Sequence, residues 1–198
     1  MLILTSIGLS APTSMEAFRS NLPSKFKSAA IVTTALNGKE KNEYARLAHE
    51  QLLTCGLGEV NFIDLEISPN HNFDRYNVLY VCGGNTFKLL KFARAAKFDE
   101  AIVELQKRGG VYIGVSAGSI LLTQSIRIAG EVLGDENEVG LTDLTGLNLY
   151  PRQVLPHYVP DIELTTVAYE DKYSVAVDRI GNLEAIIVDG ETVTRIGQ

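Results

Sequence analysis

The sequence predicts an α/β protein in which helices cover both faces of a mostly parallel sheet. Short runs of apolar and β-branched residues alternate with segments of helical periodicity from the amino terminus to residue 122. Some of these runs are apolar throughout, such as VLYVC at 78–82 and VYIGV at 111–115, as expected of strands buried on both faces. Glycine-bearing turns follow both runs. This alternation is typical of a parallel sheet with crossover helices.

Each element of the first part of the chain follows from its local pattern. Positions 44, 48, 52 and 55 are apolar at helical spacing, and Gly56 follows as a terminator. Gly109 and Gly110 end the last of the long helical segments in the same way. We expect strands at Leu2–Ser6, Ala29–Thr34, Val60–Leu65, Val78–Cys82 and Val111–Val115. We expect helices at Met15–Ser20, Lys39–Cys55, Thr86–Ala96 and Phe98–Arg108.

The remaining part of the chain has a different pattern. Residues 124–160 are rich in loop-forming residues, and three short strands are expected at Ser174–Val177, Ala185–Val188 and Thr192–Ile196. Asp189-Gly190 between the last two is a hairpin signal, so we expect a β-hairpin at the carboxyl terminus. We find neither an internal repeat nor a linker. Residues 1–198 are therefore expected to form one α/β domain.

Composition excludes several classes of function. With 45% hydrophobic and 21% charged residues and a net charge of −6, the chain lacks the basic face that a nucleic-acid partner requires. The amino terminus predicts a strand rather than a signal peptide, and no apolar stretch approaches the ~20 residues of a membrane span. Cys55 and Cys82 make no disulfide framework, so we expect reduced thiols and a cytoplasmic protein.

The strongest motif is Gly114-Val115-Ser116-Ala117-Gly118, which fits G-x-S-x-G between a strand and a helix. A sharp turn at this junction exposes the serine hydroxyl at the edge of the sheet, and small neighbours let the chain pass without clashes. This context predicts that Ser116 is a nucleophile. The alternative is a glycine-rich turn whose serine caps the next helix.

A second glycine turn, Gly83-Gly84, follows the strand at Val78–Cys82. The carboxyl ends of parallel strands share one edge of the sheet, so the two turns are expected to face one another. The backbone N–H groups of Gly84 and Ala117 would then form an oxyanion hole. The alternative is that Asn85 or Thr86 only caps the following helix.

A nucleophilic serine needs a base, and the chain has three histidines. His49 falls in a predicted helix and His71 in a polar loop. His157 lies in a short apolar segment between two prolines and is the best candidate by elimination. The three histidines lack metal-ligand spacing, and no cofactor fingerprint occurs, so we expect neither a metal nor a cofactor.

In combination these motifs resemble the serine peptidase family of dipeptidase E (aspartyl dipeptidase). The resemblance runs from Leu2 to the carboxyl terminus. It is carried by Gly83–Thr86, Gly114–Ser119, Ser125–Arg127, Gly146–Leu149 and Pro156–Tyr158. It implies a class I glutamine amidotransferase-like fold, which is flavodoxin-like, with serine in place of the usual cysteine nucleophile.

The resemblance also implies roles for individual residues. Ser116 would be the nucleophile, His157 the base and then the acid, Gly84 and Ala117 the oxyanion-hole donors, and Asn85 a neighbour of the substrate. Two departures from the family pattern leave alternatives open.

The first departure is at the acidic third member of the family's triad. The position that aligns with this acid is Ile180. Asp178 or Glu184 could replace the acid if the loop is rearranged; otherwise the site is a Ser-His dyad.

The second departure is the short segment at 161–166, which replaces a longer one rich in Arg and Glu. Selectivity for aspartate needs a cation, for which Arg127 and Arg152 are the candidates.

Two functions of different class follow. The first is a serine peptidase that hydrolyses short peptides through an acyl-enzyme on Ser116, with Asp-X dipeptides as one candidate substrate class, acting as a monomer or homodimer. The second is a catalytically weak or inactive amidotransferase-like binding or regulatory module, favoured by Ile180 at the acid position. An α/β-hydrolase is disfavoured because no histidine follows His157, and a glutamine amidotransferase because a serine stands where its cysteine is needed.

Overall fold

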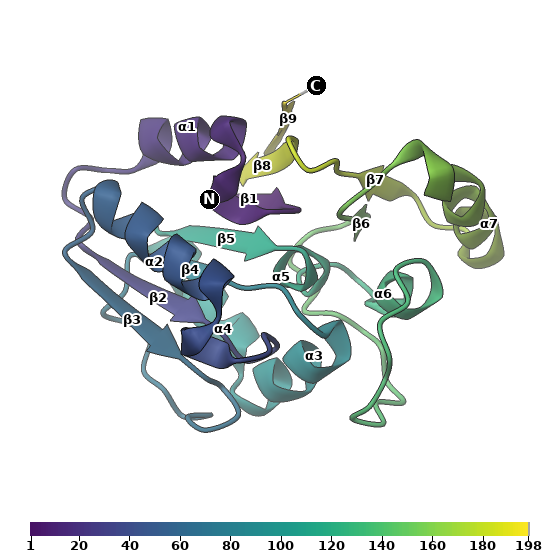
Figure 1. The fold of residues 1–198 in the computed structure, drawn as a ribbon, viewed down its shortest axis with the longest axis horizontal. Coiled ribbons are helices and arrows are strands. Elements are labelled where there is room, and N and C mark those ends of the chain that lie inside the picture. Colours follow the sequence, from purple (N-terminus) through teal and green to yellow (C-terminus); the bar gives the residue numbers. More distant parts are fainter. Residues whose placement is uncertain (198) are drawn as a thin grey trace.

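The computed structural model describes residues 1–197 and is built around a seven-stranded sheet with the order β3-β2-β4-β5-β1-β8-β9 (Figure 1). Strands β1 to β5 are parallel to one another, whereas β8 runs antiparallel to β1 and β9 antiparallel to β8. The expected α/β class and the carboxyl-terminal hairpin are confirmed. The strand bounds are β1 (Leu2–Thr5), β2 (Ser28–Val32), β3 (Glu59–Ile63), β4 (Val78–Val81), β5 (Val111–Val115), β8 (Ala185–Asp189) and β9 (Thr192–Ile196).

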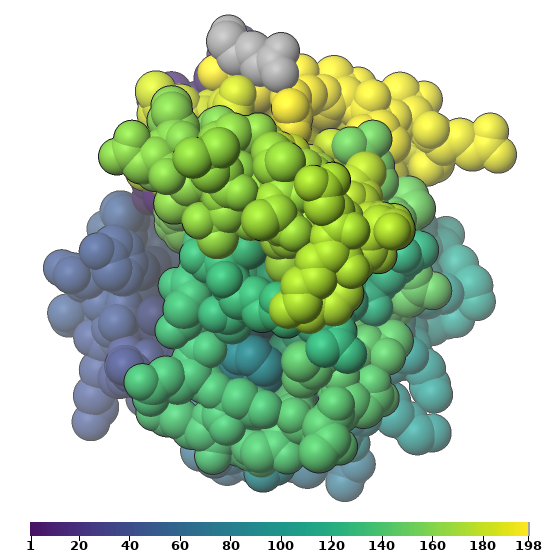
Figure 2. All heavy atoms as spheres, turned by 90° about the vertical axis from the view of Figure 1, so that its right-hand side faces the viewer, coloured from purple at the N-terminus to yellow at the C-terminus, as the bar shows by residue number. Residues whose placement is uncertain are grey.

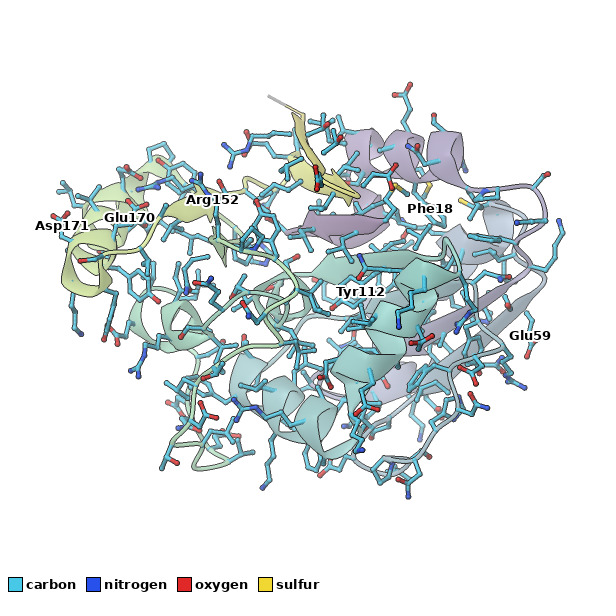
Figure 3. All side chains as sticks on the ribbon, turned by 180° about the vertical axis from the view of Figure 1, so that it is seen from behind. Phe18, Glu59, Tyr112, Arg152, Glu170 and Asp171 are labelled. Atoms are coloured by element: carbon cyan, nitrogen blue, oxygen red, sulfur yellow. The ribbon has the colours of Figure 1, made fainter. Side chains whose placement is uncertain are left out.

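Helices cover both faces of the sheet, and each face has its own apolar cluster. Helices α1 (Pro12–Asn21) and α2 (Glu43–Thr54) pack on one face through side chains such as Phe18 and Leu52. The other face carries α3 (Thr86–Ala95), α4 (Phe98–Lys107) and α5 (Ala117–Ile120), and α6 (Arg127–Glu131) and α7 (Glu163–Tyr173) add side chains to the same apolar cluster. Because successive strand residues point to opposite faces, Ile113 joins the first cluster and Tyr112 the second. Phe18 and Tyr112 are marked in Figure 3. This two-sided burial explains the continuous apolar runs of the sequence.

The part between β5 and β8 holds elements that the sequence pattern did not predict. A small parallel sheet pairs β6 (Gln153–Leu155) with β7 (Val177–Arg179), and α7 forms the crossover between them. The segment around α7 contacts α6 through a Lys172–Glu131 ion pair of 2.8 Å, at the end of the molecule shown in Figure 2. Within residues 1–197, we find no helix with the length and apolar character needed to cross a membrane.

The expected strand at Ser174–Val177 is misplaced. Ser174 has a φ of 50° in the left-handed region and ends α7, and strand pairing begins only at Val177. Helix α7 itself buries only Thr166 and Tyr169, so its sequence has little of the apolar periodicity that identifies a helix.

The topology gathers three turns at one edge of the sheet. In the register of the central strands, Val81 pairs with Gly114 and Thr5 pairs with Val115. The segments that follow β1, β4 and β5 therefore begin side by side at the carboxyl ends of these strands. Ligand sites of open parallel sheets form at this edge.

Candidate active site

Ser116 occupies the sharp turn between β5 and α5. Its backbone has φ 51° and ψ −109°, a combination that residues with a side chain rarely adopt. Such strain typically costs about 1–3 kcal/mol and persists only where the surrounding structure enforces it. Here the Ser116 N–H donates to the Thr5 carbonyl at 2.9 Å, which holds the turn against β1.

Both glycines of the G-x-S-x-G pattern are required by close backbone contacts. A Cβ on Gly114 would lie 2.7 Å from the Gly118 carbonyl oxygen, and one on Gly118 would lie 2.5 Å from the Val81 carbonyl oxygen. Any larger residue would therefore push α5 away from β4 and β5. Ser119 secures the same junction, because its buried Oγ accepts a hydrogen bond from the Thr5 N–H at 2.9 Å.

The Gly83-Gly84 turn lies directly beside Ser116. A Cβ added to Gly83 would lie 3.1 Å from the Ser116 Cβ. Gly84 has a φ of 121°, and a Cβ added there would clash with the Ala35 carbonyl. The amides of Gly84 and Ala117 donate no hydrogen bond to any group in residues 1–197. Within the described residues, both amides thus remain available to a ligand, as the N–H groups of an oxyanion hole would have to be.

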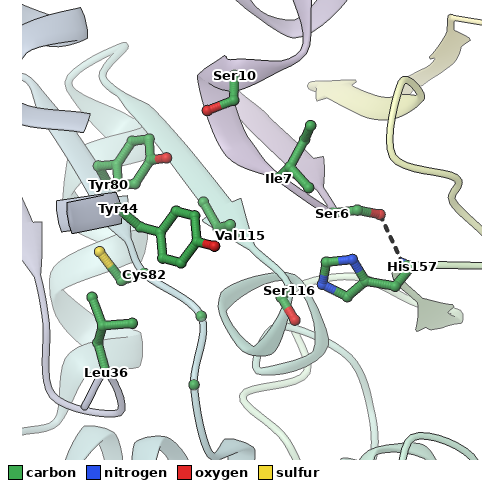
Figure 4. A pocket seen from close by; sticks show the side chains of 12 residues that line it. Ser6, Ile7, Ser10, Leu36, Tyr44, Tyr80, Cys82, Val115, Ser116 and His157 are labelled. Carbon is green, nitrogen blue, oxygen red and sulfur yellow. Dashed lines mark hydrogen bonds between the residues drawn. The ribbon is translucent and has the colours of Figure 1, made fainter. Parts of the chain in front are cut away.

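His157 reaches the same place from the segment after β6. It has a φ of 56°, and its backbone N–H donates to the Ser6 Oγ at 2.9 Å. The Ser6 hydroxyl in turn donates to the Ile180 carbonyl at 2.9 Å. The imidazole lies next to Ser116 at one end of the site (Figure 4). The Ser116 hydroxyl itself makes no hydrogen bond within the described residues.

The partner of the imidazole is a residue that the sequence analysis missed. His157 Nδ1 and Asn182 Oδ1 are 3.0 Å apart, so with Nδ1 protonated the imidazole donates to the amide oxygen and Nε2 remains an acceptor. Asn182 comes two residues after Ile180, the position aligned with the family's acid. A carboxylate is the usual third member of such a triad, so an amide in a Gly-Asn turn gives no recognisable sequence signal.

Neither of the two carboxylates proposed for the triad pairs with His157. Asp178 accepts from the Tyr150 hydroxyl at 2.7 Å and forms a 3.0 Å ion pair with Arg152. Glu184 accepts from the Gly181 N–H at 2.6 Å and so shapes the turn that presents Asn182. The buried Ile180 contributes through its backbone, because its carbonyl accepts from the Tyr158 N–H at 3.0 Å.

Three residues expected near the substrate have other contacts. Asn85 caps α3 by accepting from the Lys88 N–H at 2.9 Å, and its amide group donates to the Glu136 carbonyl at 2.7 Å. Arg127 lies 5.5 Å from the centre of the Tyr173 ring, and Arg152 pairs with Asp178. The structure therefore does not bring these side chains together with Ser116.

A cavity of about 460 Å³ opens beside Ser116 (Figure 4). This volume lies in the range of roughly 300–1,000 Å³ that is typical of small-molecule sites. Burial raises the pKa of the Cys82 thiol to about 12, so the thiol is protonated at neutral pH and is not a nucleophile. We find no group of three potential metal ligands within residues 1–197. The lining residues are Ser6, Ile7, Ser10, Leu36, Tyr44, Tyr80, Cys82, Gly83, Gly84, Val115, Ser116 and His157.

Several of these lining residues were not predicted. Three of them, Ser6, Ile7 and Ser10, come directly after β1, which lies next to β5 in the sheet. The sequence indicates only that they follow a predicted strand. Tyr44 comes from the start of α2, which no pattern in the sequence places at this edge.

Comparison with known proteins gives consistent matches. The sequence profile of peptidase family S51 matches residues 2–196. An uncharacterized peptidase of Listeria innocua is 31% identical over 186 residues, which cover 90% of this chain and 88% of that protein. Peptidase E of Salmonella paratyphi A is 31% identical over 135 residues, which cover 67% of this chain but only 56% of that enzyme.

Solved structures also match over the whole chain. A Listeria monocytogenes protein provisionally assigned as peptidase E has a TM-score of 0.79 and 26% identity, covering 100% of this chain and 98% of that one. A peptidase from an acI-B1 actinobacterium has a TM-score of 0.72 and 19% identity, covering 100% of this chain and 87% of its own. At 19% identity, the match to the actinobacterial peptidase shows a shared fold and nothing further.

Proposed function

This chain belongs to peptidase family S51, and on that premise we propose that it is a serine peptidase that hydrolyses short peptides, with Ser116 as nucleophile and His157 as general base. The observation that carries the proposal is the strained, glycine-flanked Ser116 beside an imidazole whose Nδ1 is held by Asn182. A serine that merely capped a helix would need neither the strain nor the imidazole. Ser116 makes no side-chain capping hydrogen bond to α5.

The proposed reaction has two halves. In the first, the Ser116 oxygen attacks the scissile carbonyl carbon while His157 Nε2 takes the hydroxyl proton. The carbonyl oxygen becomes negatively charged and accepts hydrogen bonds from the amides of Gly84 and Ala117. His157 then gives its proton to the leaving amine, and the C–N bond breaks to leave an acyl-enzyme ester. In the second half, water replaces the amine, with His157 as base and then as acid, which releases the acid product and restores the serine.

Asn182 would act on the imidazole rather than on the substrate. By accepting a hydrogen bond from the Nδ1–H group, its amide oxygen keeps Nε2 free to take the proton of Ser116. This contact weakens the alternative of an inactive binding module, which relied on Ile180 at the acid position. Catalytic hydrogen bonds are often long before substrate binds, and we expect the Ser116 hydroxyl to close on Nε2 in the complex.

Hydrolysis of a peptide panel tests this function. Dipeptides and tripeptides with acidic, basic and neutral residues would be incubated with the wild type, Ser116→Ala, His157→Ala and a control, Ser24→Ala, whose exposed serine is absent from the cavity lining. We expect the two active-site variants to lose at least about a thousandfold in kcat/KM, because they remove members of one catalytic unit. The control should keep wild-type activity. Cleavage that survives in Ser116→Ala would contradict the assignment, and absence of cleavage by any protein would favour the binding module.

A further inference from the structure

Among residues 1–197, no acidic side chain, no lysine and no arginine lines the cavity beside Ser116. Its wall is formed by Ile7, Leu36, Val115 and two tyrosines, and the remaining lining groups are hydroxyls, a thiol, glycines and the His157 imidazole. Two of the polar groups also stay neutral at ordinary pH, since burial raises the pKa of the Cys82 thiol to about 12 and also raises that of the Tyr80 phenol.

Three cationic side chains that come into question as partners of a substrate carboxylate are engaged elsewhere. Lys39 lies three positions from Leu36, but its ammonium group pairs with Asp64 at 2.9 Å and with Glu66 at 3.3 Å. Arg152 pairs with Asp178, and Arg127 lies over Tyr173. A carboxylate side chain placed in the cavity would therefore lose water without gaining a cation among the lining residues.

The position of His157 indicates which part of a substrate enters the cavity. The imidazole protonates the leaving amine, so the leaving group must lie on the His157 side of Ser116. Leu36, Tyr44 and Cys82 lie on the opposite side of the serine (Figure 4). The side chain on the acyl side of the scissile bond would extend away from the imidazole and toward these residues.

We propose that this cavity selects an uncharged, apolar or aromatic side chain on the acyl side of the scissile bond, and that it excludes aspartate. The inference rests on the proposed function and deepens it by naming the substrate class. It departs from the aspartyl specificity that the sequence resemblance suggested, because neither arginine considered for that role is part of the lining.

Tyr44 is the residue that would shape this preference most. Its side chain is 66% exposed although it is aromatic and lines the cavity, which places it at the entrance. Figure 4 shows its ring directed into the site between Val115 and Cys82. An apolar substrate side chain would cover the ring and remove apolar surface from water on both partners.

A matched tripeptide series tests the proposal. The peptides X-Ala-Ala, with X as Ala, Leu, Phe, Asp or Lys, differ only in the side chain that would enter the cavity. Apolar pockets gain about 10–200-fold per methylene, so we expect kcat/KM for Leu and Phe to exceed that for Asp at least a hundredfold. We expect Tyr44→Ala to reduce kcat/KM for Phe about tenfold and to change that for Ala-Ala-Ala much less.

A charge introduced into the wall provides the reciprocal test. Leu36→Arg should raise the kcat/KM ratio of Asp to Leu at least tenfold, because the guanidinium group supplies the missing partner. Leu53→Arg is the matched control, since Leu53 is 43% exposed on α2 and is not part of the cavity lining. It should leave the ratio unchanged.

The outcomes separate the inference from the function beneath it. A wild type that prefers Asp or Lys, with activity that disappears in Ser116→Ala, would overturn the inference and leave the serine peptidase intact. A wild type that cleaves no member of the series would overturn the proposed function and this inference with it. A Leu and Phe preference that Leu36→Arg shifts toward Asp would support both.

Discussion

Ser116 has a side chain that the proposed reaction needs and a backbone conformation that disfavours any side chain. The proposed chemistry needs its hydroxyl, whereas its φ of 51° and ψ of −109° favour glycine. Removing the side chain entirely should therefore relieve strain, while shortening it to alanine should not.

We expect the free energy of unfolding of Ser116→Gly to be about 1 kcal/mol higher than that of Ser116→Ala, and we expect both variants to be inactive. Urea denaturation of the two variants side by side measures this difference. Equal stabilities, or a less stable glycine variant, would show that the turn stores no strain.

Asn182 is the residue whose role depends most on its exact chemistry. Asn182→Ala should lower kcat by about 10–1,000-fold with little change in KM, because the imidazole loses its orientation and the cavity lining stays intact. Asn182→Asp should keep activity and move the acidic limb of the pH–rate profile to higher pH, since a carboxylate favours the protonated imidazole. An Asn182→Ala variant with normal kcat would contradict this positioning role.

At the scale of secondary-structure elements, the contact between α5 and β4 sets the position of the serine. Gly118→Ala would force its Cβ against the Val81 carbonyl, displace α5 and reduce both stability and activity. Such overpacking typically costs about 1–3 kcal/mol. Gly58→Ala is the control, because a Cβ there meets no atom within 4 Å. Thermal unfolding and peptide hydrolysis of both variants test this, and a Gly118→Ala protein that matches Gly58→Ala would contradict it.

Ion pairs of Arg179 on β7 with two glutamates on α7 connect the two elements. The guanidinium group bonds Glu163 at 2.7 Å and Glu170 at 2.8 Å, and its hydrogen bond holds the pKa of Glu170 below the ordinary value of 4.5. Glu170 is marked in Figure 3. A carboxylate with a lowered pKa stabilises the fold fully above that ordinary value and loses this contribution as the pH falls toward the lowered pKa.

The free energy of unfolding of the wild type should therefore exceed that of Glu170→Gln most at neutral pH, and the difference should shrink as the pH falls below 4.5. Denaturation between pH 3 and pH 7 measures it. Glu104→Gln is the control, because Glu104 pairs with Lys107 on an exposed helix face, where such pairs contribute little. A pH-independent difference at Glu170 would exclude the ion pair as its source.

At the scale of the whole molecule, the sequence predicts most reliably the elements that pack against the core. Apolar runs predict the strands of the central sheet, and apolar residues at helical spacing predict helices such as α3. These patterns are clear because the side chains at the apolar positions pack into the core. Helix α7 and the β6–β7 pair lie at the periphery, where few apolar positions leave a periodic signal. That residues 1–198 form one domain stays a prediction, favoured by the shared central sheet under both apolar clusters.

The parts of the site that short sequence motifs determine could be predicted. The Ser116 turn follows from glycine spacing, and His157 from elimination among three histidines. Asn182 and Tyr44 come from distant segments that only the folded topology brings to this edge. Their residue types have many structural uses, so no local pattern marks them.

The most direct test of the central claim is covalent labelling of Ser116 with a fluorophosphonate, followed by intact-mass measurement and peptide mapping. Only an activated serine reacts rapidly with such a reagent. The wild type should gain one adduct on Ser116, Ser116→Ala should gain none, and His157→Ala should react at least about a hundredfold more slowly, in line with the contribution of general-base catalysis. An unlabelled wild type, or a His157→Ala protein labelled at the wild-type rate, would contradict a nucleophile activated by His157.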